Sequence, residues 1–298
     1  GTTSALISKL SNFYNVSESQ FIIGNGSEEM IRLITRAYIR QGDEAVMADI
    51  TFPRYETNVV IEGGKPIKIP LDNGVHDLYQ MFEAITEKTK IVFVCNPNNP
   101  TGTIVGKEKL LNFIKRIPKN IIVVVDEAYY EYVMTEDYLE TLPLLVQFPN
   151  LIILRTFSKI YGLAGLRVGY GIMDEDIVTE LVKVKDVFNV NQLAQHAATV
   201  ALDDQGFVME CARKNAEERA YVSKALTTLG LQVFPSETNF LFVCSRQPVV
   251  TLLMEKGFMV RGLGMPGWQE AFRVTLGTRK DNDAFIEMVR QLLKESVV

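Results

Sequence analysis

The sequence predicts an α/β fold, in which a mostly parallel sheet flanked by helices forms a large domain and a smaller α+β domain follows. Short apolar runs alternate with amphipathic stretches through the first two-thirds of the chain. These runs lack the in/out alternation of half-exposed strands, as expected for parallel strands covered on both faces. The remainder reads strand–helix–strand–helix, so we place the boundary near residue 208 and expect domains at 1–208 and 209–298.

The elements of the large domain can be assigned in order. Apolar residues three or four apart at 6–13 predict an opening helix, and amphipathic stretches at 28–40 and 107–116 predict two more. Successive parallel strands need a crossover connection, so a helix between strands is the expected arrangement. Strands are expected at 20–23, 45–48, 66–69, 91–95, 121–125, 151–155 and 168–171.

A change of pattern marks the approach to the second domain. The chain turns helical after Asp174, and an amphipathic stretch at 210–229 predicts one long helix. The small α+β domain is expected to contain strands at 239–243 and 271–276 and helices at 249–256 and 281–294.

The composition excludes several classes of protein. Of the 298 residues, 47% are hydrophobic and 22% are charged, and the formal net charge is −5. An acidic chain with scattered Lys and Arg is a poor nucleic-acid binder, because phosphate contacts need clustered cations. No apolar run is long enough to span a membrane and no signal peptide is visible, so we expect a cytoplasmic protein without nucleic-acid or membrane partners.

The cysteines and histidines predict neither a metal site nor a disulfide framework. Cys95, Cys211 and Cys244 lie far apart and form no CxxC pair. His76 and His196 have no partner ligand at helical spacing. We interpret the cysteines as small buried hydrophobes and the histidines as structural or surface residues.

Polar segments follow four of the predicted strands. The segment GNGSEE begins at Gly24, NPNNPTG at Asn96, DEAYY at Asp126 and TFSKIYGLAGLRVG at Thr156. Taken singly, each is an ordinary helix cap or turn. Ligands of open α/β sheets bind at the carboxyl ends of the strands. The four segments together therefore indicate one site.

The side chains in these segments match the needs of pyridoxal 5′-phosphate (PLP). The cofactor aldehyde needs an amine, which Lys159 supplies. The pyridine nitrogen must stay protonated to accept electrons, which requires a carboxylate such as Asp126. The phenolic oxygen needs neutral donors, for which Asn99 and Tyr129 are suited. We therefore predict Lys159, Asp126 and Tyr129 as the catalytic residues.

The cofactor phosphate is expected at the first turn of the helix that follows the first strand. A helix N-terminus offers free backbone N–H groups to an anion, and hydroxyl and guanidinium groups add further hydrogen bonds. The predicted phosphate ligands are the backbone of Ser27 and Glu28 and the side chains of Thr156, Ser158 and Arg167.

The strings GNGSEE, CNPNNPTG, VVVDEAYYEY, TFSKIYGLAGLRVGYG and FRVTLGT together resemble the fold-type I PLP-dependent aminotransferases, most closely the histidinol-phosphate aminotransferase branch. The resemblance covers nearly the whole chain. It implies that Lys159 holds the cofactor as a Schiff base and that Phe52 takes the place of the aromatic residue stacked on its ring. It also implies substrate contacts from Asn99, from Arg273 to a carboxylate or equivalent group, and from Arg261 to a distal phosphate.

The resemblance implies an activity as well. The expected reaction is ping-pong transamination of an amino donor, histidinol phosphate, with 2-oxoglutarate in histidine biosynthesis, by a homodimer with sites at its interface. An aromatic amino-acid aminotransferase and a threonine-phosphate decarboxylase on the same scaffold are the alternatives.

Two other classes of protein compete with this interpretation. The string IIVVVDE resembles the Walker B strand of a nucleotide hydrolase, but GTIVGKE lacks the spacing and the Ser or Thr of a phosphate loop. A non-catalytic sensor on the PLP fold is also conceivable. The intact set of Lys159, Asp126 and Arg167 argues against lost chemistry.

The chain departs from the family pattern in three places. Glu28 stands where Asp is usual, and Lys185, Asp186 and Val187 precede Phe188-Asn189 where the branch often has an Arg and prolines. The family's N-terminal arm carries a tyrosine that reaches the neighbouring subunit's cofactor phosphate, and the printed sequence begins downstream of it. A site without that arm is expected to be incomplete and poorly active.

Overall fold

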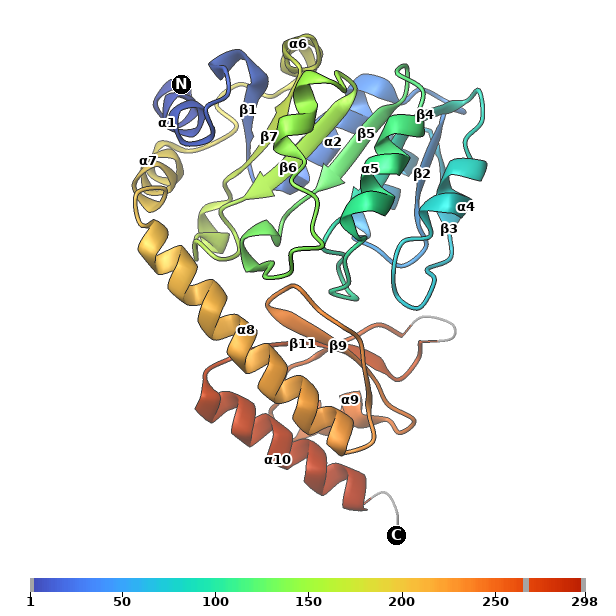
Figure 1. The fold of residues 1–298 in the computed structure, drawn as a ribbon, viewed down its shortest axis with the longest axis vertical. Coiled ribbons are helices and arrows are strands. Elements are labelled where there is room, and N and C mark those ends of the chain that lie inside the picture. Colours follow the sequence, from blue (N-terminus) through green and yellow to red (C-terminus); the bar gives the residue numbers. More distant parts are fainter. Residues whose placement is uncertain (1–2, 265–267, 296–298) are drawn as a thin grey trace.

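The computed structural model describes residues 3–264 and 268–295, which form a large α/β part and a smaller part joined by one long helix (Figure 1). All seven predicted strands of the large part are present in one sheet, in the order β1-β7-β6-β5-β4-β2-β3. Their bounds are β1 Phe21–Gly24, β2 Glu44–Ala48, β3 Lys65–Ile69, β4 Thr89–Cys95, β5 Ile122–Asp126, β6 Leu151–Thr156 and β7 Gly169–Met173.

The large sheet is mostly parallel, as predicted. Strands β2 to β6 pair in parallel. Strand β7 runs antiparallel to both of its neighbours, β6 and β1. The sheet therefore places the carboxyl ends of β4, β5 and β6 side by side at one edge.

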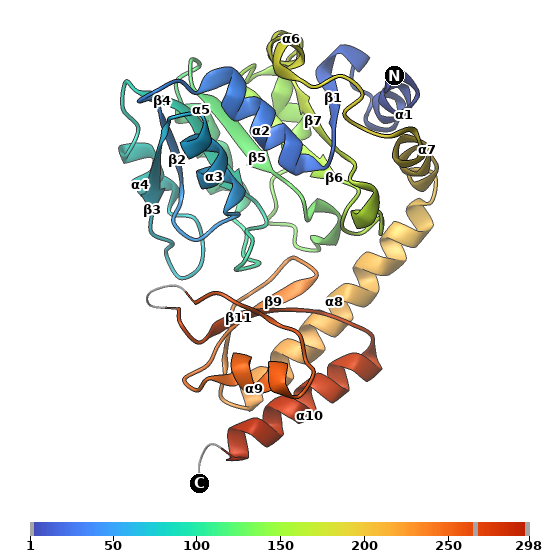
Figure 2. The same ribbon diagram turned by 180° about the vertical axis from the view of Figure 1, so that it is seen from behind.

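Helices cover both faces of this sheet. Side chains of β4 alternate between two apolar clusters, with Val92 and Val94 in one and Ile91 and Phe93 in the other. Both faces are buried, which explains the continuous apolar runs of the strands. Figure 2 shows α2 and α3 lying across the second face. The first face is covered by α1 Ser4–Tyr14, α4 Leu78–Glu83, α5 Lys107–Arg116 and α7 Gln192–Ala201, and the second by α2 Ser27–Tyr38, α3 Arg54–Ile61 and α6 Glu175–Val184.

The smaller part is an antiparallel sheet with helices packed against it. Its order is β10-β11-β9-β8. Leu226, Phe272 and Val289 are fully buried between this sheet and its helices. The elements are α8 Gln205–Thr228, β8 Gln232–Val233, β9 Phe240–Cys244, α9 Val249–Glu255, β10 Arg261–Gly262, β11 Ala271–Thr275 and α10 Arg279–Glu295.

Short segments complete the fold. Strands β8 and β10 were not predicted, because two residues are too few to show a periodic pattern. Residue 208 lies inside α8, and the domain boundary there stays a prediction. In the described residues no helix is both long and apolar enough to cross a membrane. The part of the chain that the structure describes also contains 3₁₀ helices at Glu18–Gln20, Tyr130–Tyr132, Leu142–Val146 and Ala164–Leu166.

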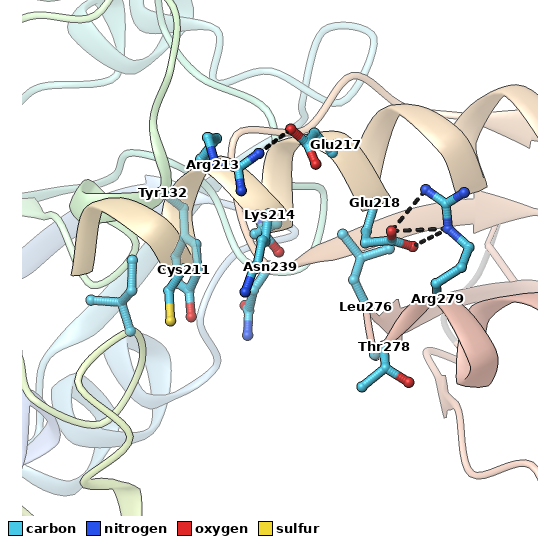
Figure 3. Close-up of a pocket in the computed structure, with 13 residues that line it drawn as sticks. Tyr132, Cys211, Arg213, Lys214, Glu217, Glu218, Asn239, Leu276, Thr278 and Arg279 are labelled. Carbon is cyan, nitrogen blue, oxygen red and sulfur yellow. Dashed lines mark hydrogen bonds and ion pairs between the residues drawn. The ribbon is translucent and has the colours of Figure 1, made fainter. Parts of the chain in front are cut away.

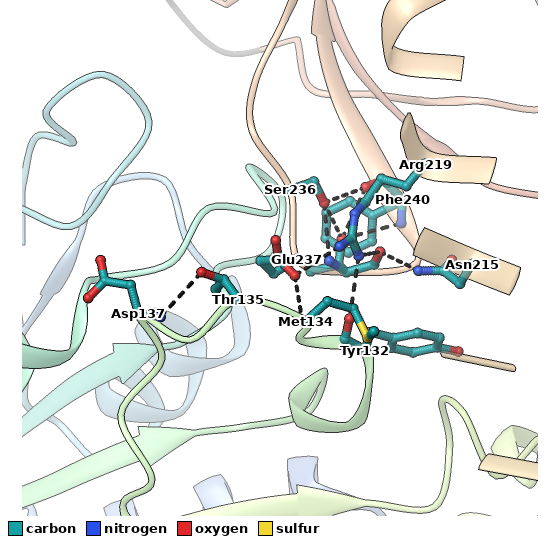
Figure 4. A network of polar contacts seen from close by, with 10 residues as sticks. Tyr132, Met134, Thr135, Asp137, Asn215, Arg219, Ser236, Glu237 and Phe240 are labelled. Carbon is teal, nitrogen blue, oxygen red and sulfur yellow. Dashed lines mark hydrogen bonds and ion pairs between the residues drawn. The ribbon is translucent and has the colours of Figure 1, made fainter. Parts of the chain in front are cut away.

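A polar network connects the two parts (Figure 4). Arg219 of α8 is only 8% exposed and pairs with Glu237, with 2.8 Å between Nη2 and Oε2. Its Nη1 donates to the carbonyl of Thr238 (3.0 Å). The Glu237 carboxylate also accepts from the backbone N–H of Met134 in the large part (2.9 Å). A buried cation is stable only with such partners, so this network fixes α8 against the loop that follows β5.

Candidate active site

A cavity of about 210 Å³ lies at the carboxyl ends of β4, β5 and β6. Its walls include every residue that the sequence predicted for the cofactor. The strand register explains this convergence, because Cys95 pairs with Asp126 across β4 and β5. The lining residues are Ser27, Glu28, Phe52, Cys95, Asn99, Asp126, Ala128, Tyr129, Thr156, Ser158, Lys159 and Arg167.

Glycines allow the first turn of α2 to approach the sheet. A Cβ at position 169 of β7 would lie 2.2 Å from the Ser27 backbone nitrogen, so only glycine fits there. Gly26, just before α2, has φ +79°, a conformation that glycine adopts without strain. The free N–H groups of the helix N-terminus are thereby directed into the cavity, as an anion site requires.

Arg167 closes the other side of this anion site. Its Nη2 would lie 2.5 Å from a Cβ on Gly26. Its Nη1 donates to the carbonyl of Ala164 (3.1 Å) and to Ser158 Oγ (3.3 Å). Arg167 has φ 58°, which is unfavourable for a residue with a side chain and is typically found at functional sites.

The remaining members of the anion site differ in what they offer. Thr156 Oγ1 accepts from the backbone N–H of Ser158 (3.1 Å), which holds both hydroxyls next to the cavity. The Glu28 carboxylate pairs with Arg54 at 2.6 Å. The side chain of Glu28 is therefore neutralised, and its backbone is what it can contribute to a phosphate.

Asp126 ends β5 and is 3% exposed. Its Oδ2 accepts from the Tyr55 hydroxyl (2.7 Å) and its Oδ1 accepts from the backbone N–H of Ala128 (3.2 Å). Burial raises the pKa of Asp126, while the Tyr55 and Ala128 hydrogen bonds and the charge of Lys159 lower it. Tyr55 was not predicted from the sequence, where it reads as one more core aromatic at the start of a helix.

Lys159 follows β6 in an irregular segment and faces the cavity. Burial lowers its pKa, and the nearby cations Arg273 and Arg167 lower it further, whereas the charge of Asp126 opposes this effect. Its Nζ lies 5.0 Å from the centre of the Tyr129 ring. A lysine with a lowered pKa is a competent nucleophile toward an aldehyde.

Asn99 and Tyr129 complete the cavity wall. Arg273 Nη1 donates to Asn99 Oδ1 (2.6 Å). Because a guanidinium only donates, this bond leaves the amide NH₂ of Asn99 available as a donor. Burial raises the pKa of Tyr129, so its hydroxyl keeps its proton. Its ring packs edge-on against Phe240 at 5.2 Å.

A second cavity of about 490 Å³ adjoins the first and shares Phe52 and Asn99 with it. Arg261 and Arg273 line this cavity. They are directly opposite each other in the antiparallel pair of β10 and β11, so both side chains extend from the same face of the small sheet. Two like charges in that position repel each other, and an anion between them would relieve the repulsion.

A larger cavity, of about 560 Å³, lies elsewhere, along α8 (Figure 3). None of the predicted site residues line it, and four of its five charged side chains are paired with one another. Arg279 pairs with Glu218 (2.8 Å) and Arg213 pairs with Glu217. The 210 Å³ cavity is a better candidate for the active site than the cavity along α8. It combines a buried acid, a lysine with a lowered pKa and an anion site.

The residues that line the 210 Å³ cavity fit PLP. The amine, the buried carboxylate, the helix N-terminus with its arginine and two neutral donors each match one functional group of the cofactor. In the described residues, no group of three or more His, Cys, Asp and Glu could hold a metal ion. The fold and this site together define a PLP-dependent enzyme of fold type I.

The chain belongs to the aminotransferase class I and II family, whose profile matches residues 2–289. It is 45% identical to the histidinol-phosphate aminotransferase of Bacillus velezensis over 297 residues, 98% of this chain and 82% of that protein. The corresponding enzyme of Brevibacillus brevis is 46% identical over 290 residues, 95% of this chain and 79% of that protein.

A solved structure has a closely similar fold. The histidinol-phosphate aminotransferase of Sinorhizobium meliloti, in complex with PLP, superposes with a TM-score of 0.93 at 26% identity. The match covers 98% of this chain and 82% of that one.

Proposed function

We propose that this protein is a histidinol-phosphate aminotransferase, which transfers the amino group of histidinol phosphate to 2-oxoglutarate in histidine biosynthesis. The observation that carries the proposal is the pair Arg261 and Arg273 on one face of the cavity beside the cofactor site. Both substrates carry two negative charges, one as a phosphate and the other as two carboxylates. A cavity with two adjacent guanidinium groups can bind each of them in turn.

The residues of the cofactor cavity take the following roles. Bound PLP supplies an aldehyde and an electron-withdrawing ring. The Lys159 amine would take up the proton that leaves the substrate Cα and release it again as the amino group is transferred. Asp126 holds a proton on the ring nitrogen, and Asn99 and Tyr129 donate to the phenolic oxygen. Phe52 packs against the ring.

The phosphate of the cofactor is held at the start of α2. The backbone N–H groups of Ser27 and Glu28 donate to it, as do the hydroxyls of Thr156 and Ser158. Arg167 supplies the opposing charge from a backbone with φ 58°, a strained conformation of the kind found at functional sites.

We also propose a cytoplasmic homodimer. Val187, Phe188 and Leu193 are 80%, 75% and 80% exposed and lie close together in sequence. Phe188 has φ 57°, which is costly for an aromatic residue. Adjacent exposed apolar residues mark interaction surfaces, and a second copy of the chain is the partner that we propose for them.

A donor screen tests the substrate assignment. Histidinol phosphate, phenylalanine, tyrosine and threonine phosphate are compared with 2-oxoglutarate as acceptor, in the native protein and in Arg261→Gln. We expect histidinol phosphate to be the preferred donor. We expect Arg261→Gln to raise its KM about 10- to 100-fold, the effect of losing a hydrogen bond to a charged group.

The same variant separates the rival donors. The KM for phenylalanine, which lacks a phosphate, should change much less. Equal effects of Arg261→Gln on both donors would instead support an aromatic amino-acid aminotransferase.

A further inference from the structure

Tyr55 is held rigidly at the back of the cofactor cavity. Its side chain is fully buried. Its ring stacks on Phe93, with centroids 4.7 Å apart and an interplanar angle of 9°. The Tyr55 and Phe52 rings also pack in a T-shaped arrangement, with centroids 5.7 Å apart. The hydroxyl therefore cannot turn away from Asp126 without dislodging the ring from this stack.

Asp126 depends on donors to remain ionised. Taking a carboxylate out of water favours its protonated form. Three groups oppose this effect: the Tyr55 hydroxyl, the backbone N–H of Ala128 and the charge of Lys159. Among these three groups the Tyr55 hydroxyl lowers the pKa of Asp126 most, ahead of the Ala128 N–H and the charge of Lys159.

We propose that Tyr55 is a positioning residue that keeps Asp126 ionised and oriented, and thereby controls whether the ring nitrogen of the cofactor carries a proton. Tyr55 donates to Oδ2 and Ala128 to Oδ1, and each oxygen has a second lone pair. The carboxylate is thus fixed in orientation with an acceptor position left for the cofactor. The inference depends on PLP in this cavity and is independent of the amino donor.

The location of Tyr55 supports this role. The segment 52–55, at the start of α3, carries Phe52 on the cavity wall, Arg54 paired with the Glu28 carboxylate and Tyr55 bonded to Asp126. One turn of chain therefore reaches the cavity wall against which the cofactor ring would lie, the anion site and the carboxylate of Asp126. A displacement of this turn would change all three contacts together.

The first test uses the protein without cofactor. Unfolding by urea is compared for the native chain and Tyr55→Phe at about pH 5 and about pH 8. Burial raises the folded-state pKa of Asp126, so its ionisation destabilises the fold, and loss of the Tyr55 donor increases that cost. Tyr55→Phe should lower the folding equilibrium constant at both pH values. We expect the factor by which it falls to be about ten times larger at about pH 8 than at about pH 5.

Tyr138→Phe is the matched control. Tyr138 is also a buried tyrosine, but its hydroxyl donates to the neutral carbonyl of Asn96 (2.6 Å). Its removal should cost the same at both pH values. In an Asp126→Asn background, the penalty of Tyr55→Phe should likewise become independent of pH.

The second test measures the cofactor directly. Nitrogen NMR of ring-labelled PLP reports whether the pyridine nitrogen is protonated. In Tyr55→Phe the resonance should move toward that of neutral pyridine, whereas in Tyr138→Phe it should stay at the native position. An unchanged resonance, or a stability penalty that is equal at both pH values and in both backgrounds, would overturn the proposal.

A fluorotyrosine at position 55 covers the case in which Tyr55→Phe fails to fold. It keeps the ring and makes the hydroxyl a stronger donor. At a fixed pH the ring-nitrogen resonance should then stay at the protonated position or move further from that of neutral pyridine. A resonance that moves toward neutral pyridine would contradict the role of Tyr55. A wrong assignment of the amino donor would alter none of these measurements.

Discussion

Lys159 lies in surroundings that favour its neutral form. Burial and the cations Arg273 and Arg167 all lower its pKa, and the charge of Asp126 counteracts them. An ordinary lysine is almost fully charged at neutral pH. The apoprotein therefore presents a larger fraction of reactive amine than a surface lysine would.

Arg273 is the largest source of this effect after burial. Replacing it, in Arg273→Gln, should raise the pKa of Lys159 and shift cofactor uptake by the apoprotein to higher pH, because only the neutral amine reacts. Uptake can be followed by the visible absorbance of the lysine-bound cofactor. Arg261→Gln, on the neighbouring strand, is the control and should not shift the profile. A shift to lower pH in Arg273→Gln would contradict this account.

Strand β7 contains two glycines at which a side chain would meet neighbouring atoms. Its first residue, Gly169, lies against the backbone of Gly26 and Ser27 at the start of α2. Gly171, two residues along, would instead meet the flexible end of Met173 at 2.4 Å. The two glycines thus differ in whether the neighbouring atoms can move.

Gly169→Ala should displace the N-terminus of α2 and weaken cofactor binding. An added methyl group against a fixed backbone typically costs about 1–3 kcal/mol. We expect a comparable loss of stability in thermal unfolding and an increase in the Kd for PLP of about tenfold or more. Gly171→Ala is the control, in which Met173 can turn aside and the Kd should be nearly unchanged. Similar Kd values for both variants would refute the close-approach argument.

Most strands of the large sheet could be predicted because they are buried apolar runs, and only β3, with the sequence KPIKI, is partly exposed along its whole length. The cofactor residues could be predicted for the same reason, since they follow these strands directly. Contacts that depend on strand pairing could not. Glu127 and Arg155 form a fully buried ion pair at 2.8 Å, but they are brought together only by the register of β5 and β6. Tyr55 has no sequence signal that distinguishes its hydrogen bond to Asp126 from ordinary core packing.

At the scale of the whole molecule, the described surface bears apolar side chains beside α7. Leu193 of α7 is 80% exposed, and Val187 and Phe188 precede it in the same stretch. The loop that carries Val187 and Phe188 is held against β1, because the side-chain amide of Asn189 donates to the carbonyl of Ile23 (3.0 Å). A fixed apolar surface of this kind fits a permanent contact.

Leu193→Glu should therefore shift the protein from dimer to monomer in sedimentation velocity, because a buried unpaired charge is strongly unfavourable at an interface. Val146→Glu is the control. Val146 is 92% exposed on a different segment, and its replacement should leave the mass unchanged. A native protein that sediments as a monomer at micromolar concentration would contradict the dimer.

Helix α8 determines how the smaller part can move. Its 24 residues span about 36 Å without a break. Such a helix behaves as a lever, and a tilt of about 5° at its first turn would carry its far end through about 3 Å. Because Arg219 is held against the loop after β5, the helix would tilt about a point partway along its length, not about its first turn. A tilt about that point would therefore move the far end of α8 less than the same tilt about its first turn.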